Sequence, residues 1–99
     1  MPASPAATTD APRALLVFTS LPDAASAETL ASALIGRRLA ACVNILAHYA
    51  SIYRWQGATE TATEVPALIK TTPARYAALE AAIRARHPSE LPATAAVPV

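Results

Sequence analysis

The sequence predicts an α+β fold in which two helices cover one face of a sheet that contains antiparallel strands. Two stretches, residues 24–38 and 71–88, carry apolar residues at helical spacing. Short apolar runs of the kind that form strands lie before, between and after these stretches. Gly57 lies in a probable tight turn between two of the runs, which therefore pair as a hairpin.

The first two elements are a strand at residues 14–20 and a helix at residues 24–38. The strand is a continuous apolar run followed by Pro22, which favours a buried strand over a helix. Asp23 is a candidate N-cap for the helix. Gly36 has a low helix propensity, so we expect the helix to fray there. The expected buried positions of the helix are Ala27, Leu30, Ala31, Leu34 and Ile35.

The second strand occupies residues 40–55 and is long for a small domain. Its apolar pattern is interrupted at residues 48–50, where we expect a bulge or bend. Gly57 can adopt positive φ and supplies the turn that follows. Because proline cannot donate to a ladder, we expect the well-paired part of the returning strand to begin at Ala67, after Pro66.

The second helix has the clearest signals of all the elements. Thr72 can cap it, Pro73 suits its first position and Pro88 ends it. Its apolar stripe comprises Tyr76, Leu79 and Ile83. A weak last strand at residues 91–99 completes the order β-α-β-β-α-β. This order is the ferredoxin-like split arrangement, a sandwich with both helices on one face of the sheet.

Composition and charge restrict the possible partners. The 99 residues favour one domain, at residues 13–99, after a tail at residues 1–12 that we expect to be disordered. The net charge is +1 and no basic run occurs, so we expect no nucleic acid and no anionic membrane as partners. No signal peptide is evident, and the single cysteine fits a reducing compartment. We therefore expect a cytoplasmic protein.

Four motifs occur in register: LAACVNI at 39–45, SIYRWQG at 51–57, LIKTT at 68–72 and HP at 87–88. Through these motifs, residues 14–99 resemble the CutA family, the divalent-cation tolerance proteins. The resemblance implies a ferredoxin-like protomer that assembles as a compact homotrimer. In that family the hairpin crosses between subunits, which implies that Tyr53 and Trp55 pack at or near a subunit interface, with Trp55 largely buried in the assembly.

The resemblance also implies a metal ligand at His87. Some family members add a second histidine and a cysteine, but Arg86 and Phe18 occupy those positions here. We therefore expect weak binding of a divalent ion and no obligatory cofactor. Cu(II) is the expected ion, because imidazole suits copper and copper heads the affinity order; Glu90 is the candidate second ligand. The alternative is that His87 only helps to end the helix through its last carbonyls.

Several other polar or aromatic residues have two interpretations each. Cys42 is either a buried small hydrophobe or a ligand or nucleophile. Residues 53–55 form either an interface or a ligand platform. Glu64 and Lys70 either line a polar crevice between subunits or form a solvated pair. Asn44, if buried, needs a hydrogen-bond partner from a loop backbone or a ligand.

The expected function is that of a non-enzymatic protein that responds to metal ions, and this fold also allows others. One is a trimeric regulatory module that binds a small metabolite at subunit boundaries. An acylphosphatase would need an anion cradle with an arginine after the first strand, and residues 20–26 contain neither Gly nor Arg. An RNA-binding domain needs exposed aromatics on the central strands, where the first strand offers only Phe18. Cys42 and His87 are the only Cys–His option for a nucleophile and base, and nothing local joins them, so we predict no catalytic activity.

Overall fold

The computed structural model describes residues 13–86 and 94–99. The expected tail at residues 1–12 lies outside this part of the chain. The elements are β1 (Leu15–Leu21), α1 (Ala24–Gly36), β2 (Cys42–Ile45), β3 (Tyr49–Trp55), β4 (Ala58–Thr71), α2 (Pro73–Arg86) and β5 (Thr94–Pro98). The order agrees with the prediction except that the second strand is divided into β2 and β3.

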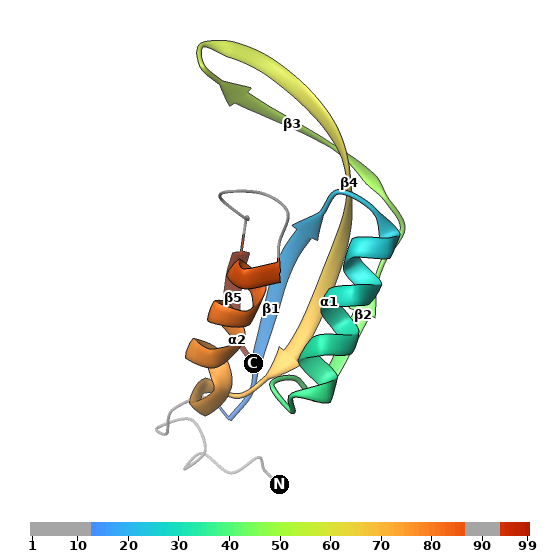
Figure 1. Ribbon diagram of the computed structural model, residues 1–99. Coiled ribbons are helices and arrows are strands. Elements are labelled where there is room, and N and C mark those ends of the chain that lie inside the picture. The colour runs from blue at the N-terminus through green and yellow to red at the C-terminus, as the bar shows by residue number, and fades with distance from the viewer. Residues whose placement is uncertain (1–12, 87–93) are drawn as a thin grey trace, which may run out of the picture.

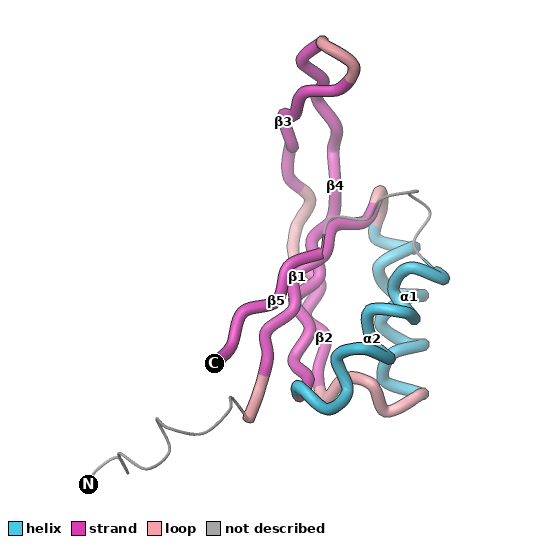
Figure 2. The backbone as a smooth tube through the Cα atoms, turned by 90° about the vertical axis from the view of Figure 1, so that its left-hand side faces the viewer, coloured by secondary structure: helices cyan, strands magenta, loops and turns pink. Residues whose placement is uncertain are grey.

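Both helices lie on one face of the sheet, as predicted (Figure 2). The strand order is β2-β4-β1-β5, with β3 also paired to β4, and these pairings are antiparallel. β4 has 14 residues. Its second half lies inside the sheet between β1 and β2, whereas its first half pairs with β3. The β3–β4 hairpin, which we call the arm, projects beyond the helices (Figure 1).

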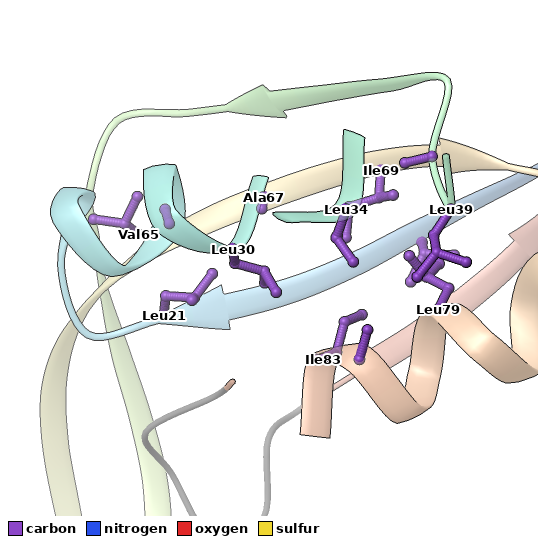
Figure 3. Packing of buried hydrophobic residues seen from close by; sticks show 13 residues of the cluster. Leu21, Leu30, Leu34, Leu39, Val65, Ala67, Ile69, Leu79 and Ile83 are labelled. Atoms are coloured by element: carbon purple, nitrogen blue, oxygen red, sulfur yellow. The ribbon is translucent and has the colours of Figure 1, made fainter. Parts of the chain in front are cut away.

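The core fills the space between the helices and the sheet (Figure 3). Its buried apolar residues are Val17, Leu21, Ala27, Leu30, Leu34, Leu39, Ala40, Val65, Ala67, Ile69, Leu79, Ala82 and Ile83. Two of the positions predicted to be buried on α1 are not: Ala31 is half-buried, and Ile35 is 44% exposed. Each follows a buried leucine by one residue and so points about 100° away from it around the helix.

The helices begin at the predicted residues. The Ser26 N–H donates to Asp23 Oδ1 at 2.7 Å, which confirms the N-cap of α1. Pro73 is the first residue of α2, where a missing N–H costs no intrahelical bond. The predicted end of α2 at Pro88 lies outside the described residues; the described part of this helix extends to Arg86. No helix in the described ranges is long and apolar enough to cross a membrane.

α1 ends at Gly36, and the chain reverses just after it. Arg38 has a φ of 58°, in the left-handed region. The Arg38 N–H donates to the Ile35 carbonyl at 3.0 Å, and the Leu39 N–H donates to the Leu34 carbonyl at 2.9 Å. These two bonds form a Schellman motif with arginine, rather than glycine, at the left-handed position.

A β-bulge separates β2 from β3. Ile45 pairs with Ala67 and Tyr49 pairs with Glu64, so residues 46–48 face only two residues of β4. The extra residue defines a bulge. The predicted break in the strand is therefore confirmed, although it lies slightly earlier than residues 48–50.

The prediction that pairing in the returning strand begins only at Ala67 is wrong, because β4 continues through Pro66. Pro66 lies opposite Ser20 of β1, and its carbonyl accepts the Leu46 N–H at 3.0 Å. An extended residue directs its N–H and its carbonyl to the same side. The donor that Pro66 lacks would therefore face the bulge, where the ladder is already interrupted. The bulge thus explains how proline fits inside this strand.

Candidate functional site

The arm ends in a two-residue turn between the paired residues Trp55 and Ala58. Gln56 has a φ of 50° and Gly57 a φ of 82°. Positive φ at both central residues is typical of a type I′ turn, whose twist matches that of a hairpin. The prediction of a tight turn at Gly57 is confirmed, and it places Trp55 at the tip of the arm.

One face of the sheet carries no helix, and the bulge directs the aromatic side chains of the arm to this face. Side chains alternate along a strand, so one extra residue reverses which face the later side chains share. Asn44 pairs with Leu68 and Tyr49 pairs with Glu64, both on the same face of β4. We call this surface the open face; it includes Leu16, Phe18, Ser20, Asn44, Tyr49, Tyr53, Trp55, Glu64, Leu68 and Lys70.

A hydrogen bond between two hydroxyls joins the base of the arm to the sheet. The Tyr49 hydroxyl bonds to Ser20 Oγ, and Ser20 is a residue of β1 that is 4% exposed. Ser20 lies opposite Pro66, beside the bulge. The bond therefore links β3 to β1 across β4 at the point where the arm leaves the domain, and it helps to set the direction of the arm.

The predicted interface residues are exposed in a single protomer. Tyr53 is 46% exposed and Trp55 is 56% exposed, both on the open face. Ile52, on the opposite side of the arm, is 72% exposed. Large apolar side chains that gather on a projecting element are typical of an interaction surface. The packing of Tyr53 and Trp55 against another subunit is a property of the assembled protein, and it stays a prediction.

The sheet part of the open face is also apolar. Phe18 lies opposite Leu68, and Leu16 lies opposite Val97 on the other side of β1. Phe18, Leu68 and Leu16 are half-buried, and Val97 is 55% exposed. The helices cover only the other face of this sheet (Figure 2). An apolar surface therefore continues from the middle of the sheet to the arm.

Cys42 and Asn44 lie on the edge strand β2. The Cys42 thiol donates to Asn44 Oδ1 at 3.7 Å. Cys42 is half-buried, so it is not the fully buried small hydrophobe of the first interpretation. Asn44 is exposed, so its amide does not need the loop partner that a buried asparagine would require.

Glu64 and Lys70 share the open face but lie far apart on it. Glu64 is opposite Tyr49 at the base of the arm, and Lys70 is opposite Leu16 towards the other end of the sheet. Six positions along a strand span about 20 Å. The interpretation of these residues as a solvated pair therefore does not hold within one protomer.

The predicted metal ligands His87 and Glu90 lie outside the described residues. Within residues 13–86 and 94–99, no three His, Cys, Asp or Glu side chains gather closely enough to hold a metal ion. Phe18, at the position where some relatives are expected to carry a cysteine, lies half-buried on β1.

Tyr76 is a polar group at the edge of the core. It packs against the buried cluster, and its hydroxyl donates to Glu80 Oε2 at 3.3 Å. Burial raises the pKa of Tyr76, and the negative charge of Glu80 raises it further. The phenol therefore stays protonated at neutral pH and can donate to Glu80, which lies one turn further along α2.

A cavity of about 470 Å³ lies at the end of the sheet opposite to the arm. Arg38, Lys70 and Arg75 line it, together with alanine, threonine and isoleucine side chains. Arg75 Nε donates to the Arg38 carbonyl at 3.0 Å, although the two residues are 37 positions apart. Because each of these residues resembles an ordinary surface cation in the sequence, no local pattern predicted that they would meet.

Comparisons with known proteins agree with this architecture. The divalent-cation tolerance protein CutA of Thermus thermophilus is 40% identical over 84 residues, which are 85% of this chain and 82% of that protein. The protein of the same name from Citrobacter koseri is 35% identical over 88 residues, covering 89% of this chain and 76% of its own. These relatives match along most of their length.

Solved structures agree equally well. CutA1 from Shewanella sp. SIB1 has a TM-score of 0.88 at 40% identity, with coverage of 91% of this chain and 84% of that one. CutA from Xylella fastidiosa has a TM-score of 0.86 at 42% identity, with coverage of 88% and 84%. A family model described as "CutA1 divalent ion tolerance protein" matches residues 15–99. The chain therefore belongs to the CutA1 divalent ion tolerance protein family.

Proposed function

We propose that the protein is a non-enzymatic homotrimer that takes part in the response to divalent metal ions. The names of its relatives, divalent-cation tolerance proteins, support the metal-related role. The observation on this chain that supports self-association is the apolar surface that continues from the open face to the exposed rings of the arm. The number of subunits is inferred from the family resemblance.

The physical argument for association is the apolar area that one protomer leaves in water. Ile52, Tyr53 and Trp55 are each about half exposed or more. Burying apolar surface contributes about 25 cal/mol per Å², or about 1.5–3 kcal/mol for a large side chain. Three copies that covered one another's arms would gain this term three times, without a change in the fold of each protomer.

Light scattering at micromolar concentration tests the assembly. We expect a mass of about three times the protomer mass of 10.3 kDa. Ile52→Asp should shift the mass towards that of one protomer, because it places a charge in the proposed interface. Ile35→Asp is the matched control, since Ile35 is also exposed but lies on α1. A clean monomer for the wild-type chain would refute the trimer.

For the metal we propose weak binding of Cu(II) through His87, with Glu90 as a second ligand. A neutral imidazole favours copper among the divalent first-row ions. A single histidine with one carboxylate makes a poor ligand set, which supports weak affinity. Binding should weaken as the pH falls through the ordinary histidine range near ~6.5, because the ligand must be neutral.

Titration calorimetry with Cu(II) on the wild type and on His87→Ala tests the ligand. We expect the heat of binding to be lost in His87→Ala. His48→Ala is the matched control, because His48 is an exposed histidine at the bulge. Equal copper binding by the wild type and His87→Ala would show that His87 is not a ligand and serves only to end α2.

The non-enzymatic role is supported by the surroundings of the one thiol. Cys42 donates to the amide oxygen of Asn44, which is not a base that could activate a nucleophile. We expect no hydrolysis of acetyl phosphate by the purified chain. Turnover that a single substitution abolishes would contradict this proposal.

We also propose a cytoplasmic location, which the single cysteine supports, because such a chain needs no oxidising compartment for a disulfide. A relative from Archaeoglobus fulgidus is described as periplasmic, so the location requires its own test. Fractionation of the native host with an antibody against the protein should place it in the cytoplasmic fraction.

A further inference from the structure

We propose that the cavity at the end of the sheet opposite to the arm binds a phosphoryl group carried by a small soluble molecule. Four segments meet there: the end of β4, the start of β1, the loop after α1 and the start of α2 (Figure 1). The volume of about 470 Å³ lies within the range of about 300–1,000 Å³ usual for small-molecule sites. This site is separate from the proposed copper ligands and from the arm.

The first argument is the distribution of charge. The chain has eight Lys and Arg residues and seven Asp and Glu residues, so it is close to neutral. Three of the eight cations line this one cavity, and none of the carboxylates of the described residues does. Two more cations are adjacent in the sequence: Arg13 precedes the lining residue Ala14, and Arg37 precedes Arg38. Such a concentration of positive charge in a concave site favours a ligand with more than one negative charge.

The second argument is that one guanidinium is held in position before any ligand arrives. Arg75 Nε donates to the Arg38 carbonyl at 3.0 Å, and Arg75 Nη1 donates to Thr72 Oγ1 at 3.4 Å. A guanidinium has five N–H donors, so these two bonds orient the group and leave donors for a ligand. The planar fork of arginine matches two oxygens of a phosphoryl group.

The third argument is the backbone conformation of Arg38. This residue has a φ of 58°, which glycine adopts easily and arginine only at an energetic cost. Glycine would relieve that cost but would remove a cation from the cavity wall. Arg38 thus supplies both a charge and the carbonyl that holds Arg75.

The walls of the cavity are tied together by further hydrogen bonds. The Ala41 N–H donates to the Lys70 carbonyl at 2.8 Å, and the Thr71 hydroxyl donates to the Leu39 carbonyl at 2.6 Å. Thr71 is buried, so this second bond fixes the loop after α1 against the end of β4. Lys70 is exposed and is one of the residues that line the cavity. The backbone of the cavity wall is therefore held in place before a ligand binds.

Two smaller features also favour the binding of a phosphorylated molecule in this cavity. Thr72, at the start of α2, lines the cavity, and the first turn of that helix contains no acidic residue. The partial positive charge of the helix end is therefore not neutralised locally. Ile35, Ala40 and Ala41 form an apolar part of the wall, which suits the carbon portion of a phosphorylated molecule better than a bare ion.

Titration of the full chain with inorganic phosphate and pyrophosphate, followed by backbone amide NMR shifts, tests this site. We expect saturable binding of one anion per protomer, with shifts at the start of α2 and in the loop after α1. Pyrophosphate should bind more tightly than phosphate, and acetate much more weakly, because the site holds three cations. Affinity should fall as the salt concentration rises.

Variants separate this site from a general effect of charge. Lys70→Gln and Arg75→Gln should each weaken pyrophosphate binding by about three- to tenfold, the loss expected for one charge-assisted hydrogen bond. Arg84→Gln is the matched control: it removes the same charge from α2 near its other end and should leave the affinity unchanged. Circular dichroism and light scattering verify that each variant keeps its fold and its assembly.

Three results would overturn the proposal. The first is the absence of saturable binding at millimolar pyrophosphate. The second is an equal loss of affinity in Arg84→Gln and Lys70→Gln, which would indicate attraction by net charge alone. The third is binding only to vesicles that contain phosphatidic acid, which would identify a surface for lipid headgroups rather than a site for a soluble molecule.

Discussion

At the scale of the residue, a few side chains and backbone angles determine where helices begin and where the chain reverses. Asp23 caps α1, and Arg38 and Gln56 adopt positive φ although neither is glycine. Positive φ costs a residue with a Cβ about 1–2 kcal/mol. The two residues lie where the chain reverses direction: Arg38 beside the cationic cavity and Gln56 at the tip of the arm.

The charge on Asp23 should make stability depend on pH. The Ser26 N–H donates to the carboxylate and lowers the pKa of Asp23 below its ordinary value of 3.8. A lowered pKa in the folded state means that the stabilisation is complete above 3.8 and is lost as the pH falls through the folded value. We expect the melting temperature of the wild type to fall more steeply below about pH 4 than that of Asp23→Asn, which keeps a capping oxygen without the charge. Parallel melting curves for the two proteins would contradict this.

The turn of the arm should accept a stabilising substitution. Gln56 occupies the first position of a type I′ turn, where Asn before Gly is strongly preferred. We expect Gln56→Asn to raise the free energy of unfolding by about 0.5–1 kcal/mol, measured by urea denaturation. Gly57→Ala should lower it, because Gly57 has a φ of 82°. A loss of stability in Gln56→Asn would show that the glutamine side chain has a role of its own.

At the scale of the element, the bulge between β2 and β3 has the widest consequences. It admits Pro66 into β4, and it reverses the alternation of side chains so that Tyr53 and Trp55 share the open face with Phe18. It also brings Tyr49 to Ser20. One extra residue in one strand therefore determines both how the arm leaves the domain and which side chains it presents.

Deletion of Ala47 tests this role of the bulge. Without the extra residue, two residues of the strand face two residues of β4, so the alternation runs unbroken and Tyr49 stays opposite Glu64. The uninterrupted ladder then passes Pro66, which has no N–H to donate. We expect the free energy of unfolding to fall by about 1–3 kcal/mol, since a backbone group opposite Pro66 is left without a donor. Ala47→Ser keeps the chain length and is the control. A deletion variant as stable as the control would show that β4 accommodates Pro66 without the bulge.

At the scale of the whole molecule, the protomer is extended rather than compact. Its radius of gyration is 15.5 Å and its dimensions are 50 × 30 × 23 Å. A compact domain of 100 residues has a radius of gyration of about 13 Å. The arm accounts for the difference, since it projects away from the helices and the rest of the sheet (Figure 2). Such a shape supports the proposal that other copies cover the arm.

Trp55 reports on that proposal directly, because it is the only tryptophan of the chain. In the assembly we expect its fluorescence to be shifted to the blue relative to the unfolded protein. Trp55→Ala should lower stability by about 3–5 kcal/mol, as for a buried ring. Arg54→Ala, on the opposite side of β3, is the control. Emission equal to that of free indole and unchanged on unfolding would show that Trp55 stays in water.

The sequence by itself determined the order of the elements, the starts of both helices, the turn of the arm and most of the core. These features depend on neighbours within a few residues: the cap of Asp23, the position of Pro73, the conformation of Gly57 and the helical spacing of Leu79 and Ile83. It also placed Tyr53 and Trp55 on one side of a hairpin, because alternation in a strand is a local property.

Only the tertiary structure decided the features that depend on distant partners. The place of Pro66 within β4 depends on the bulge in the strand opposite it. The cationic cavity exists because the ends of several segments meet, which joins Arg38 to Arg75 across 37 positions. The pairing of strands and the packing of helices bring such residues together. Their spacing along the chain does not predict this, because the hydrogen bonds and charges involved act through space rather than along the backbone.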